Sequence, residues 1–375
     1  MSSAPSKTVW VLLAGFVAAG CSPVKAHYVG VDVVSINIET SAVSALVDGT
    51  LIVHSTNGGR NQGGLHAVDP ETAQVIWEVF GGPGAPGFTT VRDTIWRVDG
   101  ELLYGFGPDG TALGNVALPC APTTELVVSS DGNAMAVRCT DDMKLINGAG
   151  ELQWERTGSW PLALSGSDVL LLEGLELVSA SLADGTPTWS FSNDTDLAGA
   201  VSTGALVAVL ERNGTLSLLD AKDGTLKLTL EGVADLPVFA GDGRFAVPDA
   251  DITGDLDHRI YSEQGELLWR TGTRCDGPSF DSRGRMLAMC VFDGWTQMTL
   301  WDVDGEVRGS EMYQTFDPNN PIHFSAPLVL DGRAVILQNY LGELSIYDVR
   351  GAEPALGTWS RGDYGNRYST FGTEH

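Results

Sequence analysis

Short runs of apolar residues, separated by polar turns that end in glycine, repeat along most of this chain. A β run, a turn and a second β run recur eight times at a spacing of about 40 residues. The turns align on Ala73, Gly110, Gly150, Gly185, Gly224, Gly265, Gly305 and Gly351. A period of about 40 to 50 residues with several short strands per unit is typical of a propeller. The pattern therefore predicts an all-β fold, an eight-bladed β-propeller of four-stranded antiparallel blades, over residues 42–361.

Each repeat divides into four strands, which we name A to D from the centre of the ring outward. The fifth repeat contains AGAVSTG, ALVAVLER, TLSLLDA and TLKLTLE, and the eighth places its D strand around Trp359. Residues 28–38 form an additional alternating strand. Because pairing of the two chain ends removes an exposed sheet edge, we expect this segment to complete the eighth blade or to cap the first. The pattern predicts no helix, and residues 362–375 form a polar, glycine-rich tail.

The N-terminal segment has the features of an export signal. Residues 1–20 contain Lys7 and then an apolar stretch that is too short to span a membrane. The stretch ends in VAAGC, which resembles the lipobox of bacterial lipoproteins and predicts acylation of Cys21. Residues 21–41 would then be the lipidated cysteine, a linker and the N-terminal strand. This indicates a protein anchored by lipid in the bacterial cell envelope, at the outer membrane; the alternative is cleavage after Ala26 and a secreted or periplasmic protein.

The formal net charge of −26 narrows the classes of partner. Nucleic acids and anionic lipid surfaces attract proteins through clusters of Lys and Arg, so neither is an expected partner. An acidic chain is compatible with divalent cations and with basic partners, although a solubilising acidic surface explains the same charge.

Four cysteines remain when Cys21 is set aside. The segments Cys120–Cys139 and Cys275–Cys290 occupy the same part of the third and seventh repeats, and each spans an antiparallel hairpin. Because the ends of such a hairpin are neighbours, we expect disulfides Cys120–Cys139 and Cys275–Cys290, which an oxidising exported compartment would preserve.

Tryptophan recurs at the start of the D strand. Trp77, Trp154, Trp189 and Trp269 share one offset from the turn, and Trp359 follows four residues later in the last repeat. The phrase A-x-D-x-x-x-G-x-x-x-W resembles the repeat of pyrroloquinoline-quinone-type (quinoprotein-like) propellers. That resemblance implies that the five indoles are structural and pack between neighbouring blades. Lipidated members of that superfamily include the propeller subunit of the outer-membrane β-barrel assembly machine, which implies a scaffold rather than an enzyme.

One loop has the spacing of a calcium ligand set. Asp249, Asp251, Thr253, Asp255 and Asp257 lie in DADITGDLD, between strands B and C of the sixth repeat. Alternate oxygens of a tight loop can converge on Ca²⁺, so this loop is a candidate structural calcium site. The competing interpretation is a solvated acidic loop.

The remaining motifs do not indicate catalysis. Quinone-dependent dehydrogenases resemble one another in an adjacent Cys-Cys disulfide, which this chain lacks, and the histidines show no ligand spacing. We therefore expect a non-enzymatic protein, with no cofactor beyond the candidate Ca²⁺, that binds other envelope proteins through its B–C and D–A loops. Arg60 and Asn61 are polar tips of the long B–C loop of the first repeat, for which the competing interpretation is an ordinary surface loop. Two alternatives stay open: a quinone- or Ca-dependent oxidoreductase-like propeller, and a Ca-stabilised adhesion propeller at the cell surface.

Overall fold

The structure is a computed structural model, and it describes most of the repeat region of the chain. The described residues are 31–35, 40–48, 50–55, 64–69, 72, 74–80, 88–91, 93–122, 126–129, 132–192, 195–250, 256–292, 295–315, 328–330, 333–338 and 343–348. No helix in this part of the chain has the length and apolar character needed to cross a membrane.

Seven blades are each built from four consecutive antiparallel strands. Blade one contains β2 (Thr40–Val47), β3 (Thr50–Ser55), β4 (Gly64–Val68) and β5 (Val75–Phe80). Blade two contains β6 (Phe88–Val91), β7 (Thr94–Asp99), β8 (Leu102–Phe106) and β9 (Ala112–Ala117). Blade three contains β10 (Val127–Val128), β11 (Ala134–Arg138), β12 (Asp142–Asn147) and β13 (Leu152–Thr157).

The second half of the ring repeats this arrangement. Blade four contains β14 (Trp160–Ser165), β15 (Asp168–Glu173), β16 (Glu176–Ser181) and β17 (Pro187–Ser192). Blade five contains β18 (Leu197–Ser202), β19 (Leu206–Glu211), β20 (Leu216–Asp220) and β21 (Leu226–Leu230). Blade six contains β22 (Val238–Phe239), β23 (Phe245–Ala250), β24 (Leu256–Tyr261) and β25 (Leu267–Arg270). Blade seven contains β26 (Cys275–Phe280), β27 (Met286–Phe292), β28 (Trp295–Trp301) and β29 (Val307–Thr315).

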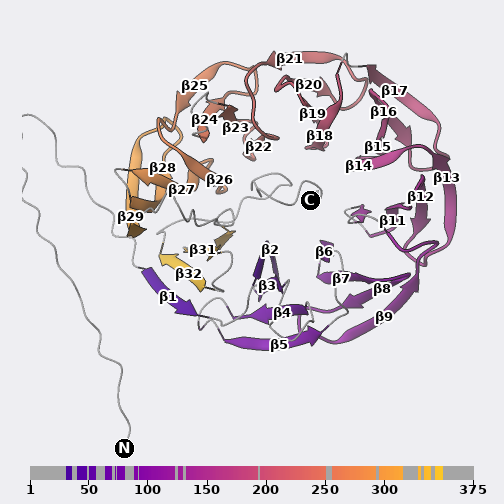
Figure 1. Ribbon diagram of the computed structural model, residues 1–375, viewed down its shortest axis with the longest axis horizontal. Coiled ribbons are helices and arrows are strands. Elements are labelled where there is room, and N and C mark those ends of the chain that lie inside the picture. Colours follow the sequence, from indigo (N-terminus) through magenta and orange to yellow (C-terminus); the bar gives the residue numbers. More distant parts are fainter. Residues whose placement is uncertain are drawn as a thin grey trace, which may run out of the picture.

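The last sheet joins the two ends of the ring and is built differently. Its inner strands are β30 (Leu328–Leu330), β31 (Arg333–Gln338) and β32 (Glu343–Asp348), and its outer strand is β1 (Val31–Ser35) from the N-terminal side. Strand β1 pairs antiparallel with β32, from Val31 opposite Tyr347 to Ser35 opposite Glu343. Figure 1 shows β1 beside β32 at this junction of the ring.

The prediction of eight blades, each made from its own repeat, is therefore wrong. Seven blades have that construction, and the closing sheet takes its outer strand from the N-terminal segment instead of from the region around Trp359. The physical reason is that a ring closed in this way is fastened across the junction by backbone hydrogen bonds between the two ends of the chain. Of the two placements considered for the N-terminal strand, completion of the last sheet is the one observed. Trp359 itself lies outside the described residues.

The hydrophobic core lies between blades and not within them. One cluster combines Ile52 and Leu65 of blade one with Phe88, Ile95 and Phe106 of blade two. Every other described cluster likewise draws its residues from two adjacent blades. Strands B and C are buried on both faces by neighbouring blades, which explains their nearly continuous apolar sequences. The outer D strands, such as β13 and β21 at the rim in Figure 1, are largely exposed.

The structure places four of the five indoles at the same blade-to-blade contact. Each indole donates a hydrogen bond from Nε1 to a carbonyl in the C–D turn of the next blade. The pairs are Trp77 with Pro108 (2.8 Å), Trp154 with Leu182 (3.0 Å), Trp189 with Ala221 (2.9 Å) and Trp269 with Val303 (3.3 Å). The indole therefore fixes the position of the following blade as well as burying apolar area.

The repeated turn glycines face these indoles. Gly224 has φ +70°, and a Cβ atom there would lie 2.7 Å from Cε3 of Trp189. Gly305 has the same relationship to Trp269, with the nearest approach 2.6 Å. The glycine is thus required twice, because only glycine accepts this backbone conformation readily and because any side chain would displace the indole.

Substitution of Gly224 by alanine should therefore lower the free energy of unfolding more than the same substitution at a glycine that has a positive φ but does not contact an indole. Gly166 has φ +58° in the A–B turn of blade four, and a Cβ atom there would meet nothing within 4 Å. We expect Gly166→Ala to lower the free energy of unfolding by about 1 kcal/mol and Gly224→Ala by about 3 kcal/mol, as urea unfolding would measure. Equal losses in the two variants would show that the contact with Trp189 is unimportant.

Candidate functional site

Antiparallel strands place the connections of every blade on two opposite faces of the ring. The D–A connections and B–C turns share one face, which we call the crossing face. Two large apolar side chains of the described residues are exposed there, Trp160 at 43% and Leu175 at 44%, at the start of β14 and in the B–C turn of blade four. The other exposed large apolar residues lie in outer strands or C–D turns: Val75, Ile76, Leu113, Leu152, Leu226, Leu267, Leu268, Val303 and Val307.

Trp160 is held against the neighbouring blade by a cation–π contact. The guanidinium carbon of Arg138, the last residue of β11, lies 3.9 Å from the centroid of the indole ring. Such a contact contributes about 0.5 to 1 kcal/mol at an exposed site. The indole consequently presents an ordered apolar surface at the boundary between blades three and four.

The connection that precedes Trp160 is clamped by an ion pair. Arg156 of β13 pairs with the carboxylate of Glu173 at the end of β15, through both Nε and Nη2. Ser159 donates a hydrogen bond from Oγ to the same carboxylate, and the backbone N–H of Gly158 donates to the carbonyl of Asp141 at 2.8 Å. These bonds join the D–A connection to the B–C turns of both blades, so Trp160 is positioned by a rigid frame.

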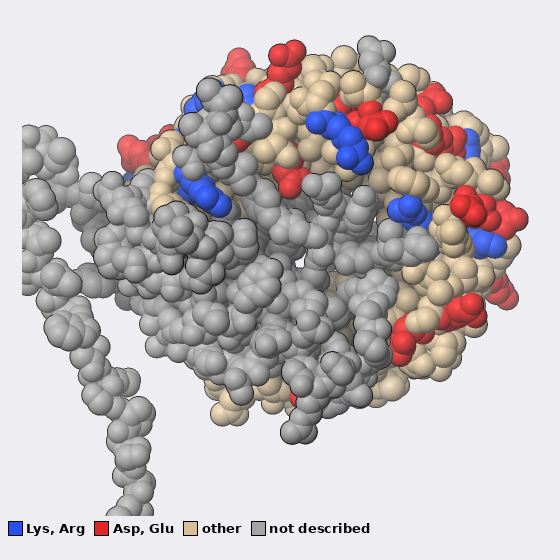
Figure 2. Space-filling model, in the orientation of Figure 1, with Lys and Arg blue, Asp and Glu red and all other residues tan. Residues whose placement is uncertain are grey.

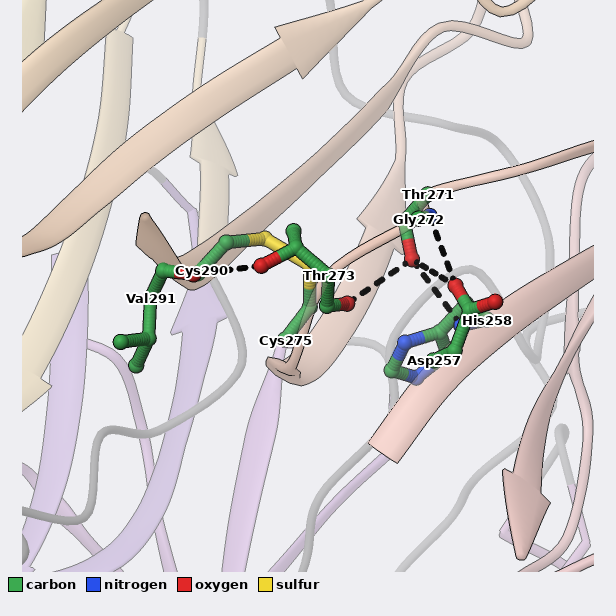
Figure 3. The surroundings of a disulfide bond; sticks show 8 residues. All are labelled: Asp257, His258, Thr271, Gly272, Thr273, Cys275, Cys290 and Val291. Atoms are coloured by element: carbon green, nitrogen blue, oxygen red, sulfur yellow. Dashed lines mark hydrogen bonds between the residues drawn. A yellow bond between two sulfur atoms is a disulfide. The ribbon is translucent and has the colours of Figure 1, made fainter. Parts of the chain in front are cut away.

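The structure contains both predicted disulfides. Cys120, in the connection between β9 and β10, is bonded to Cys139 directly after Arg138, with the Cα atoms 6.0 Å apart. The second disulfide joins Cys275 to Cys290 across β26 and β27 (Figure 3). The first disulfide fastens the crossing face beside Trp160, and the second fastens it where blade seven meets blade six.

Two members of the candidate calcium loop are described. The carboxylate of Asp249 lies 3.3 Å from Arg259 Nε and 3.3 Å from Arg270 Nη1. Asp257 accepts hydrogen bonds from Thr271 Oγ1 (2.6 Å) and from the backbone N–H of Gly272 (2.9 Å), as Figure 3 shows. Both carboxylates thus already bind groups of the protein.

The rest of that loop, Asp251, Thr253 and Asp255, lies outside the described residues, and so do Cys21, Arg60 and Asn61. Among the residues that are described, no three His, Cys, Asp or Glu side chains lie close enough together to hold a metal ion. The calcium site stays a prediction. The contacts of Asp257 show a structural role that the sequence did not indicate, which is to hold the D–A connection between blades six and seven.

His258 lies beside this network and is fully buried. Its backbone N–H donates a hydrogen bond to Thr271 Oγ1 at 3.0 Å. Burial lowers the pKa of the imidazole to about 4, and the neighbouring Asp257 carboxylate opposes that shift. The side chain is therefore neutral at pH 7.

The low pKa of His258 predicts that acid destabilises the fold. In the unfolded chain this imidazole binds a proton at about pH 6.5, whereas in the folded protein it does so only near pH 4, so its contribution is complete above pH 6.5 and is lost as the pH falls. We expect the free energy of unfolding to drop by about 3 kcal/mol from this group between pH 7 and pH 4. In His258→Gln, urea unfolding across this range should show a correspondingly smaller drop; an identical pH dependence would contradict the assignment.

Charged side chains are mixed over the ring. Figure 2 shows acidic and basic groups interspersed around the rim, without one extended basic patch on the described part of the face in view. This mixed distribution accords with a formal net charge of −26, and the exclusion of nucleic acid as a partner stays a prediction.

Comparison with known proteins supports the fold. No protein-family model and no curated protein sequence matches the chain. Among solved structures, the chain is similar to BamB from Moraxella catarrhalis (TM-score 0.59, 13% identity, covering 84% of this chain and 98% of that one). It is also similar to the C-terminal WD40 domain of Sif2 (TM-score 0.61, 14% identity, 85% and 99%) and to the computationally designed Ika8 protein (TM-score 0.63, 12% identity, 84% and 98%).

At such low identities these similarities establish a β-propeller of four-stranded antiparallel blades and nothing finer. The predicted relationship to pyrroloquinoline-quinone-type repeats receives no support from a family model. What these proteins share with this chain is the ring of blades.

Proposed function

We propose that this protein is a non-catalytic scaffold of the bacterial cell envelope, which binds another envelope protein through the crossing face of blades three and four. The observation that carries the proposal is Trp160, an exposed indole that is held in place by Arg138 and by the clamped connection before it. Tryptophan and arginine are the residues most enriched at the energetic centres of protein interfaces. An aromatic side chain that is already ordered loses little conformational entropy on binding.

The contacts around Trp160 suit a protein partner. Leu175 adds a second exposed apolar side chain from the B–C turn of the same blade. Arg138, Arg156 and Glu173 supply charged groups around this apolar centre. An apolar centre with a polar rim is the usual anatomy of a protein–protein interface. The structural similarity to BamB, together with the export signal that the sequence predicts, supports the envelope as the place where the scaffold acts.

Capture of partners by the full-length protein tests the role of Trp160. We expect Trp160→Ala to reduce the recovery of the bound envelope protein from detergent-solubilised envelopes by at least about tenfold, because the indole is the central contact. Leu226→Ala serves as the matched control, because Leu226 is 50% exposed but lies on the outer strand β21. If both variants recover the partner as well as the unmodified protein does, the crossing face of blades three and four is not the binding surface.

The lipid anchor that we propose on Cys21 makes an independent prediction. A single acyl chain gives marginal membrane binding, and several chains on one cysteine give stable binding, so Cys21→Ser should move the protein from the membrane fraction to the soluble fraction. The comparison should be made by fractionating cells that express each form in full length. A substituted protein that stays with the membrane would show that its attachment does not depend on this cysteine.

A further inference from the structure

Arg97 is a buried cation in a place where the other blades have none. It lies on β7, the second strand of blade two, and is 3% exposed. Its Nε and Nη2 atoms are fully buried, and neither has a hydrogen-bond partner among the residues that the structure describes. Taking a guanidinium out of water costs several kcal/mol unless another group compensates for the lost hydration.

The repeat provides an internal comparison for this position. Each of the seven blades has a β-bulge in strand C, which provides a common reference point. We compare the strand-B residue that pairs with the strand-C residue directly before the two bulged positions. Arg97 pairs in this way with Tyr104. In the other blades the position is occupied by small or aliphatic residues, all fully buried: Val53, Val137, Leu171, Val209, Val247 and Ala288. An aliphatic side chain therefore satisfies the fold, and the arginine of blade two calls for another explanation.

The two buried atoms form the edge of the guanidinium that this protein uses elsewhere to bind carboxylates. Arginine presents Nε–H and Nη2–H side by side, in a planar fork that matches the two oxygens of a carboxylate. Among the described residues, four other arginines use this edge on an acidic side chain. Arg156 contacts both oxygens of Glu173, whereas the other three contact a single oxygen: Arg285 on Asp281 (2.7 and 2.6 Å), Arg308 on Asp302 (2.7 and 2.6 Å) and Arg244 on Asp242 (2.8 and 2.5 Å). At Arg97 the same edge is buried and has no hydrogen-bond partner among the described residues.

The surroundings of Arg97 favour a singly charged ligand. Phe88 on β6 and Tyr104 on β8 pair with Arg97 from either side, so aromatic residues flank its strand position. Burial lowers the pKa of the guanidinium, while Asp99 and Tyr104 act in the opposite direction. One guanidinium balances one negative charge, whereas a dianionic phosphate would leave a buried excess charge beside Asp99. Arg97 lies three residues, or about 10 Å of strand, before the B–C turn at Gly100 on the crossing face.

We propose that the interface between blades one and two contains a carboxylate-binding site, in which the Nε–Nη2 edge of Arg97 receives the two oxygens of a ligand carboxylate. The ligand is a monoanion, either a free small carboxylic acid or the carboxyl terminus of a polypeptide. The site is separate from the Trp160 surface and does not depend on the function proposed for it.

Thermal unfolding of the full-length protein at pH 7 tests this site. The buffer keeps a constant ionic strength while sodium acetate replaces sodium chloride up to about 100 mM. We expect the Tm to rise by about 2 °C and to reach a plateau as acetate fills the site. Arg97→Leu should unfold at a higher Tm than the unmodified protein in chloride, because an unpaired buried charge is removed, and acetate should not raise its Tm. Arg212→Leu removes the same charge from an exposed residue of blade five and should keep the full acetate response.

Arg97→Gln provides a second variant that keeps a polar side chain, and it should also lose the response to acetate. An acetate response of equal size in the unmodified protein and in both Arg97 variants, or no response in any of them, would overturn the proposal.

An acetylated tripeptide with a free carboxyl terminus, compared with its amide, separates the two sources of ligand. A larger shift with the free acid than with acetate assigns the site to a polypeptide terminus, and a shift no larger assigns it to a small acid. Trp160→Ala should respond to acetate as the unmodified protein does.

Discussion

The structure depends on the contact between each blade and the next. A four-stranded sheet with two apolar faces is not stable alone in water, and here both faces of the inner strands are covered by neighbouring blades. The indole at the start of the D strand makes this contact specific. Trp189 donates to Ala221 and lies against Gly224, so one side chain sets both the distance and the orientation of the next blade. The turn glycine and the tryptophan of successive repeats are therefore one structural unit that is divided between two blades.

Closure follows from the same requirement. The first and last blades of an open stack would each expose an apolar face, and joining them removes both faces at once. The strand that completes the closing sheet comes from the N-terminal segment, so the ends of the ring are held together by the backbone pairing of β1 with β32. The disulfide Cys120–Cys139 ties a D–A connection to the end of the neighbouring strand. On such a scaffold the blades hold the connections in fixed positions, and the side chains that the connections expose are available for binding.

The two surfaces that we connect with binding differ in how they depart from the regular repeat. Trp160 departs from the repeat because its large aromatic side chain faces solvent. Arg138 holds the indole in place, and the hydrogen bond from Ser159 to Glu173 holds the connection before it. Arg97 departs from the repeat because it places a charged side chain at a buried position that small or aliphatic residues occupy in the six other blades. Residues that violate a local rule without an evident gain for the fold are the expected signature of functional sites. A repeat protein makes such violations measurable because its other blades act as references.

Much of the architecture could be predicted from the amino-acid order because it rests on local periodicity. Alternating apolar residues, turn glycines and the fixed offset of Trp77, Trp154 and Trp189 indicated stacked antiparallel blades, and the matching positions of the cysteine pairs indicated the two disulfides. The origin of the last outer strand was not accessible in the same way, because β1 and β32 are distant in sequence and either end of the chain could have supplied that strand.

The order of the amino acids is enough to define the repeat, its strands and the residues that recur from blade to blade within this chain. Which side chains share an interface depends instead on how the blades pack. The stacking of Arg138 on Trp160, the ion pair between Arg156 and Glu173 and the burial of Arg97 each depend on how one blade lies against the next. The physical reason is that the period fixes where a residue lies within its own sheet, whereas burial, charge pairing and exposure depend on the atoms that the adjacent sheet brings to it.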